Sequence, residues 1–140
     1  MLRLHHLLGL ILTLFLLTAC GAEIARLSPA EAAQRVAAGT AVLIDVREST
    51  EWAQTGIVAG ATPLALSDLR GERRDWKPFL AANKDRELIL YCRSGNRSGQ
   101  AARLLAAEGY RTANAGGLRD WLAAGQKVAP VPVTAPTGPK

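Results

Sequence analysis

The chain has 140 residues, of which 49% are hydrophobic and 21% are charged, and its formal net charge is +5. This length is enough for one domain and too short for two domains of ordinary size. The positive balance slightly favours small anionic ligands. Because no basic run contains interleaved aromatic residues, we expect no nucleic-acid partner.

Residues 1–19 predict a bacterial lipoprotein signal peptide. Their apolar stretch, Leu7 to Leu17, is shorter than the roughly 20 residues that span a bilayer comfortably. The end of the segment, Leu17-Thr18-Ala19-Cys20, resembles a lipobox, which implies cleavage before Cys20 and a lipid on its sulfur. Gly21 follows instead of aspartate, so we expect an anchor in the outer membrane rather than the inner one, facing the periplasm. The alternatives are ordinary secretion with Cys20 unmodified and a retained membrane anchor.

Loss of this segment changes the inventory of reactive side chains. Both histidines, His5 and His6, lie within it, so the mature chain has no histidine for a general base or a metal site. If Cys20 carries lipid, Cys92 is the only free thiol. A single leftover cysteine in an exported protein raises the question of its reactivity.

Helices and strands are expected to alternate along the mature chain. After a lipidated linker over residues 20–26, Ser28-Pro29-Ala30-Glu31 has the pattern of a capping box with proline in the first turn, and Gly39 is placed to end that helix. Residues 68–82 predict two short helical pieces, interrupted at Gly71 and Pro78. The other expected elements are strands at 41–44, 87–91 and 110–113, helices at 48–54, 98–108 and 118–124, and an extended connector at 58–64.

This alternation predicts a single α/β domain with a mainly parallel sheet flanked by helices. We place the domain at residues 27–126. The helix over 98–108 is expected to pack through Ala101, Ala102, Leu104, Leu105 and Ala106. Residues 127–140 contain four prolines and few apolar anchors, so we expect a disordered tail.

The most informative segment is the cysteine loop, Cys92-Arg93-Ser94-Gly95-Asn96-Arg97-Ser98. It stands between an expected strand and an expected helix. Successive backbone N–H groups in such a loop can point inward, and a helix start adds its positive dipole end. A thiol in this setting, beside two arginines, is expected to have a lowered pKa and to meet anions readily.

The cysteine loop and several other motifs together resemble the single-domain rhodaneses, a family of sulfurtransferases. The other matching segments are Asp45-Val46-Arg47-Glu48, Glu51-Trp52, Gly56, Gly60-Ala61 and Gly116-Gly117-Leu118 with Trp121. The resemblance implies that the Cys92 thiolate takes the outer sulfur of thiosulfate or a similar donor. The resulting persulfide then passes that sulfur to a thiophilic acceptor, such as cyanide or a thiol. Neither a cofactor nor a metal is implied.

The resemblance also implies roles for individual residues. The loop amides of Arg93, Ser94, Gly95, Asn96, Arg97 and Ser98 would hold the charge of the persulfide. The arginines in that loop would offset the charge of the donor, and Gly95 would permit the tight turn. Asp45 and Arg47 are expected to be supporting residues, with Asp45 accepting loop N–H groups or pairing with an arginine, and Arg47 pairing with Glu51.

Loop length distinguishes the expected chemistry from that of a related branch. Four residues separate Cys92 from Arg97, one fewer than in the phosphatases and arsenate reductases that resemble this fold, which favours a persulfide over phosphate. Three alternatives remain open: a low-turnover module that binds sulfur compounds or a partner protein, a redox-active thiol that lacks a resolving cysteine, and phosphate or arsenate chemistry. One departure from the family is Ile57, which occupies a position where many members have histidine.

Overall fold

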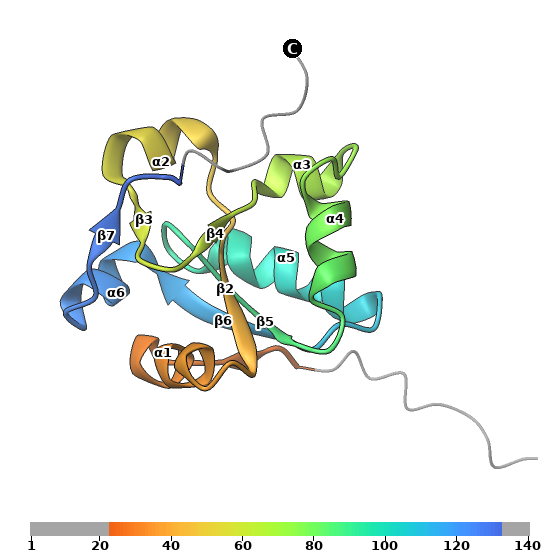
Figure 1. Ribbon diagram of the computed structural model, residues 1–140, viewed down its shortest axis with the longest axis horizontal. Helices are drawn as coiled ribbons and strands as arrows, with labels where there is room; N and C mark the ends of the chain where they lie inside the picture. Colours follow the sequence, from red (N-terminus) through yellow and green to blue (C-terminus); the bar gives the residue numbers. More distant parts are fainter. Residues whose placement is uncertain (1–22, 133–140) are drawn as a thin grey trace, which may run out of the picture.

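A five-stranded parallel sheet forms the centre of the structure, a computed structural model that describes residues 23–132 (Figure 1). The strands run in the order β1-β6-β5-β2-β4, with bounds Ala25–Arg26, Thr112–Gly117, Glu87–Cys92, Ala41–Asp45 and Thr62–Pro63. A separate antiparallel pair joins β3, Ile57–Val58, to β7, Val128–Ala129. The helices are α1 Pro29–Ala37, α2 Ser49–Thr55, α3 Leu66–Arg70, α4 Trp76–Ala82, α5 Asn96–Ala107 and α6 Leu118–Ala123.

The central strand β5 is buried on both faces, which explains its continuous apolar sequence. Side chains alternate along a strand, so Leu88, Leu90 and Cys92 join one core, with residues of α3, α4 and α5. Ile89 and Tyr91 join the opposite core, with residues of α1, α6 and β3. This arrangement confirms the predicted α/β class. The Cys92 side chain lies on the face of the sheet that α5 covers.

The predicted start of the first helix is confirmed. The Glu31 N–H donates to Ser28 Oγ at 3.3 Å, and the Ser28 N–H donates to the Glu31 carboxylate at 2.9 Å. These reciprocal bonds satisfy N–H groups that a helix start otherwise leaves unpaired. Gly39 follows the helix with a φ of 75°, which favours glycine.

Two details of the predicted helices are wrong. Gly71 does separate α3 from α4, but Pro78 lies in the first turn of α4, where no backbone N–H has a helical partner and proline costs no hydrogen bond. Leu104 of α5 is 39% exposed, so it does not belong to the packing face of that helix. The connector over 58–64 also contains part of β3 and all of β4.

The ordered structure extends beyond the predicted domain bounds, 27 and 126, at both ends. Ala25 and Arg26, placed in the linker, pair with Ala113 and Asn114 of β6. The predicted disorder is wrong for the first part of the tail, because Val128 and Ala129 pair with β3 and the Ala59 N–H donates to the Lys127 carbonyl at 2.9 Å. Residues 133–140, the signal segment and Cys20 lie outside the described residues. Within residues 23–132, no helix is long and apolar enough to cross a bilayer.

The contact between α2 and β7 predicts a stability difference between two glycines. Gly56 has a φ of 70°, and a Cβ there would lie 2.7 Å from the Ala129 carbonyl oxygen, whereas Gly60 has a φ of 83° with open space around it. We expect Gly60→Ala to lower the free energy of unfolding by about 1 kcal/mol and Gly56→Ala by about 3 kcal/mol. Urea unfolding of both variants measures this, and equal losses would contradict the packing of β7 against Gly56.

Candidate active site

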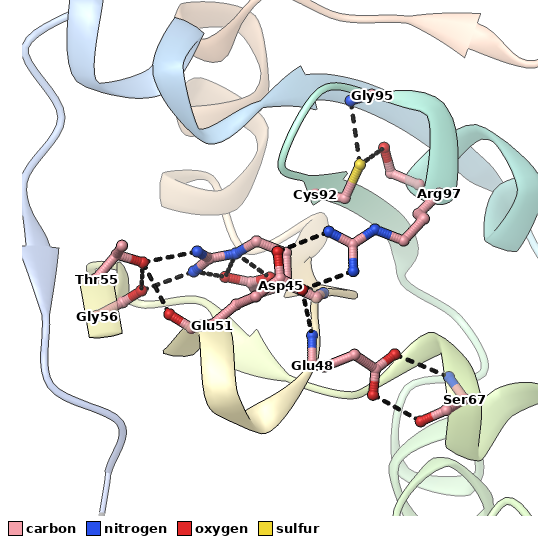
Figure 2. A network of polar contacts seen from close by, with 11 residues as sticks. Asp45, Glu48, Glu51, Thr55, Gly56, Ser67, Cys92, Gly95 and Arg97 are labelled. Carbon is pink, nitrogen blue, oxygen red and sulfur yellow. Dashed lines mark hydrogen bonds and ion pairs between the residues drawn. The ribbon is translucent and has the colours of Figure 1, made fainter. Parts of the chain in front are cut away.

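The cysteine loop turns the chain from β5 into α5 over three residues. Cys92 ends the strand, Asn96 begins the helix, and Gly95 caps it with a φ of 91°. The Gly95 N–H donates to the Cys92 Sγ at 3.1 Å (Figure 2). A Cβ at Gly95 would lie 3.3 Å from the Gly116 Cα, so the predicted need for glycine at this turn is confirmed.

The thiol is buried yet set up to ionise. Burial opposes the charged form, but the Ser98 hydroxyl and the backbone N–H groups of Ser98, Ser94 and Gly95 together outweigh it, so the pKa of Cys92 is lowered. The Ser98 hydroxyl lies 3.5 Å from the Cys92 Sγ and 2.8 Å from the Asn114 Oδ1. Because a hydroxyl has one hydrogen, it donates to one of these acceptors at a time. The backbone donors are therefore the constant part of the stabilisation.

Asn114, on the neighbouring strand β6, holds the cysteine loop in place through hydrogen bonds. The sequence did not predict this role. Its Nδ2 donates to the Gly95 carbonyl at 2.9 Å, and its Oδ1 accepts from the Ser98 hydroxyl and from the Gly116 N–H at 3.1 Å. The available signal was a lone polar residue between Ala113 and Ala115, one position beyond the strand expected at 110–113. Buried amides normally have hydrogen-bond partners, and here both the amide nitrogen and the amide oxygen have them.

The glycine pair at the end of β6 allows the loop to approach the sheet closely. Gly117 pairs with Cys92 across a register shift between β5 and β6. A Cβ on Gly117 would lie only 2.6 Å from the Arg93 carbonyl oxygen. The motif identified in the sequence therefore has a steric purpose, which is to leave room for the main chain of the cysteine loop.

The Arg97 side chain pairs with α2. Its guanidinium donates to the two oxygens of Glu51 at 2.6 and 2.8 Å (Figure 2). The hydrogen bond from Arg97, together with the Glu48 N–H, outweighs partial burial and lowers the pKa of Glu51 to about 2. An arginine in the first turn of a helix is unfavourable with the helix dipole, and the Glu51 carboxylate compensates for it. The predicted pairing of Arg47 with Glu51 is wrong, because Arg47 turns back onto Asp45.

Asp45 and Arg47 form a buried network that supports the site. The Arg47 guanidinium donates to the Asp45 carboxylate at 2.6 Å and to the Gly56 carbonyl at 2.7 Å. The Tyr91 hydroxyl donates to Asp45 at 2.5 Å and accepts from the Val58 N–H at 2.8 Å. Burial and the Asp45 charge raise the pKa of Tyr91 well above its usual value. The network ties β2 and β3 to Tyr91, the residue that precedes Cys92.

The remaining loop side chains point to solvent or to a neighbouring helix residue. Asn96 is exposed, and its Oδ1 accepts from Gln100, so it adds no side-chain contact to the sulfur. Arg93 and Ser94 are exposed and line a cleft of about 700 Å³, which we call the loop cleft. Its full lining is Arg47, Glu51, Gln54, Thr55, Arg93, Ser94, Leu118, Arg119, Asp120 and Leu122.

Fold and site together define an α/β protein with an activated cysteine at a strand-to-helix turn. The chain belongs to the rhodanese family, since the family model for the Rhodanese-like domain matches residues 28–124. It is 32% identical over 101 residues to the putative sulfurtransferase YtwF of Bacillus subtilis, covering 71% of this chain and 91% of that one.

Two further similarities point the same way. The thiosulfate:glutathione sulfurtransferase of Saccharomyces cerevisiae is 32% identical over 94 residues, with 60% of this chain and 66% of the yeast protein covered. The human single-domain sulfurtransferase TSTD1 matches with a TM-score of 0.55 and 31% identity, covering 74% of this chain and 97% of the human one. These similarities confirm the family resemblance seen in the sequence and support a sulfurtransferase-type function.

The donors around Cys92 predict how its titration responds to substitution. Ser98→Ala removes a hydroxyl that reaches the sulfur, so we expect the pKa of Cys92 to rise. The rate of alkylation by iodoacetamide as a function of pH measures that pKa. Ser94→Ala is the matched control, because it keeps the backbone N–H and removes only an exposed hydroxyl. A larger shift in Ser94→Ala than in Ser98→Ala would contradict this assignment.

The Glu51–Arg97 pair predicts a loss of stability in acid. The folded pKa of Glu51, about 2, lies below its usual value of 4.5, so the unfolded chain binds more protons in this window. Its contribution is therefore present above the usual value and is lost as pH falls toward 2. We expect the free energy of unfolding of Glu51→Gln to depend less steeply on pH than that of wild type.

Urea unfolding at a series of pH values measures both slopes. Glu72→Gln is the control, because Glu72 forms an exposed pair with Arg74, and we expect it to keep the wild-type slope. A Glu51→Gln variant with the wild-type slope would show that the ion pair does not form in solution.

Proposed function

We propose that the protein transfers sulfane sulfur through a persulfide on Cys92, with thiosulfate or a similar anion as donor and a thiol as acceptor. The observation that carries the proposal is the set of N–H donors around a buried thiol whose pKa is lowered. The name of the yeast relative, which specifies thiosulfate and glutathione, supports both substrate classes.

The first half-reaction begins with the ionised thiol. The Cys92 thiolate attacks the outer sulfur of thiosulfate, a new S–S bond forms, and the old S–S bond breaks with its electron pair leaving on sulfite. The lowered pKa of Cys92 increases the fraction of the thiol that is ionised, which is the nucleophilic form. The N–H groups that hold the thiolate are then placed to hold the persulfide.

The ion pairs of the site make the roles of the two loop arginines unequal, whereas the sequence suggested that both offset the charge of the donor. Arg97 is already neutralised by Glu51, so it contributes less to the attraction of a dianion than two independent loop arginines would. Arg93 is exposed at the loop cleft and has no ion-pair partner among residues 23–132. The donor therefore meets Arg93 together with the backbone donors. The ion pair of Arg97 mainly fixes the first turn of α5.

Sulfur loading of Cys92 is directly measurable. After incubation of the full chain with thiosulfate and removal of excess donor, we expect the intact mass to increase by one sulfur atom. Cys92→Ser is expected to show no increase, whereas Cys20→Ser, which removes the other cysteine of the chain, should keep it. Loading that survives Cys92→Ser, or no loading of wild type, would overturn the proposal.

A further inference from the structure

The loop cleft lies between three elements that meet beside the cysteine. Its walls come from the segment that includes α2, from the cysteine loop and from α6. The thiol itself does not line it, and Cys92 is fully buried. Ser94, whose backbone N–H helps stabilise the thiolate, does line it. The cleft is therefore adjacent to the reacting sulfur without containing it.

When Cys92 carries a persulfide, an acceptor does not have to reach the buried Sγ, because the transferable sulfur is the outer atom. The S–S bond length is about 2 Å, so the transferable sulfur stands about that far beyond the Cys92 Sγ. An acceptor seated beside Ser94 has to approach only this outer atom. A small molecule that fits within a cleft suits that geometry better than the flat surface of another protein, because Cys92 is fully buried.

Only some of the charged side chains that line the loop cleft are free to interact with a ligand. Arg47 is paired with Asp45 and Glu51 with Arg97, while the Asp120 carboxylate accepts the Gly117 N–H at 3.0 Å. Arg93 and Arg119 are exposed, and within the described part of the chain neither forms an ion pair. Asp120 keeps its negative charge while it accepts the Gly117 N–H, so the unpaired charges of the loop cleft are one negative and two positive, and their sum is positive.

The apolar part of the cleft comes from α6. Leu118 and Leu122 line it, and Leu122 is 48% exposed. The volume, about 700 Å³, lies within the range of small-molecule sites. A ligand with a short apolar or amide stem and one or more carboxylates matches this lining, because arginine binds carboxylates through paired, charge-assisted hydrogen bonds.

We propose that the loop cleft is the acceptor site and takes a small thiol bearing carboxylates, with Arg119 binding a carboxylate group. The inference rests on the proposed function. In this step the acceptor thiolate attacks the outer sulfur of the Cys92 persulfide, the S–S bond to Sγ breaks, and Cys92 leaves as a thiolate. The acceptor departs as a persulfide carrying the transferred sulfur, and no external oxidant or reductant is consumed.

The test separates this second half-reaction from the first. The full chain is loaded with thiosulfate, freed of donor and mixed with glutathione, which carries carboxylates, or with 2-mercaptoethanol, which carries none. The decay of the persulfide is followed by intact mass. We expect Arg119→Ala to raise the glutathione concentration for half-maximal rate about tenfold, the loss expected for one charge-assisted pair. Transfer to 2-mercaptoethanol should be unchanged, and Arg119→Lys should recover part of the loss.

Arg103→Ala is the matched control, because it removes the same charge from an exposed position on α5 outside the loop cleft. Equal effects of Arg119→Ala on both thiols, or no effect on glutathione, would overturn the acceptor site. Transfer to a protein thiol but to neither small thiol would overturn it as well. Absence of a persulfide on wild type would instead overturn the proposed function.

Discussion

The structure depends on how the backbone turns around the Cys92 sulfur. Only three residues connect β5 to α5, so the N–H groups that follow the cysteine face its sulfur instead of water. Such a turn is possible only where the adjacent strand leaves room for its main chain. Gly117 on β6 leaves that room because it has no Cβ. Asn114 then holds the turn by bonding the Gly95 carbonyl. Packing, hydrogen bonding and the lowered thiol pKa are thus consequences of one short connection.

The fold was predictable wherever local chemistry and buried pattern agreed. The capping box at Ser28, the apolar run of β5 and the glycine at the loop each have one favourable structure, so the sequence alone identified them. The ends of the domain were not predictable in the same way. Two-residue strands such as β1 and β7 carry no periodicity, and their pairing depends on partners far away in the chain.

The candidate site was predictable in its nucleophile and loop but not in its ion pairs. Sequence spacing does not determine which of several nearby acids an arginine pairs with. In this structure the pairing follows from which side chains are buried together. Arg47 is drawn to Asp45 because both are sequestered in the core, which leaves Glu51 for Arg97. The role of Asn114 could not be predicted from the sequence, because it depends on contacts with Ser98 and Gly95, which precede it by 16 and 19 residues. Cross-sheet partners follow from tertiary structure and not from motif spacing.

The shortness of the outer strands has a consequence for solubility. Both edges of the main sheet, β1 and β4, are two residues long, and β4 ends in Pro63, which has no N–H to offer. In the smaller sheet, β7 is likewise two residues long and is followed at once by Pro130. Exposed edges are where separate chains join by strand addition and begin to aggregate. This family member therefore presents few main-chain donors through which a second copy can extend either sheet.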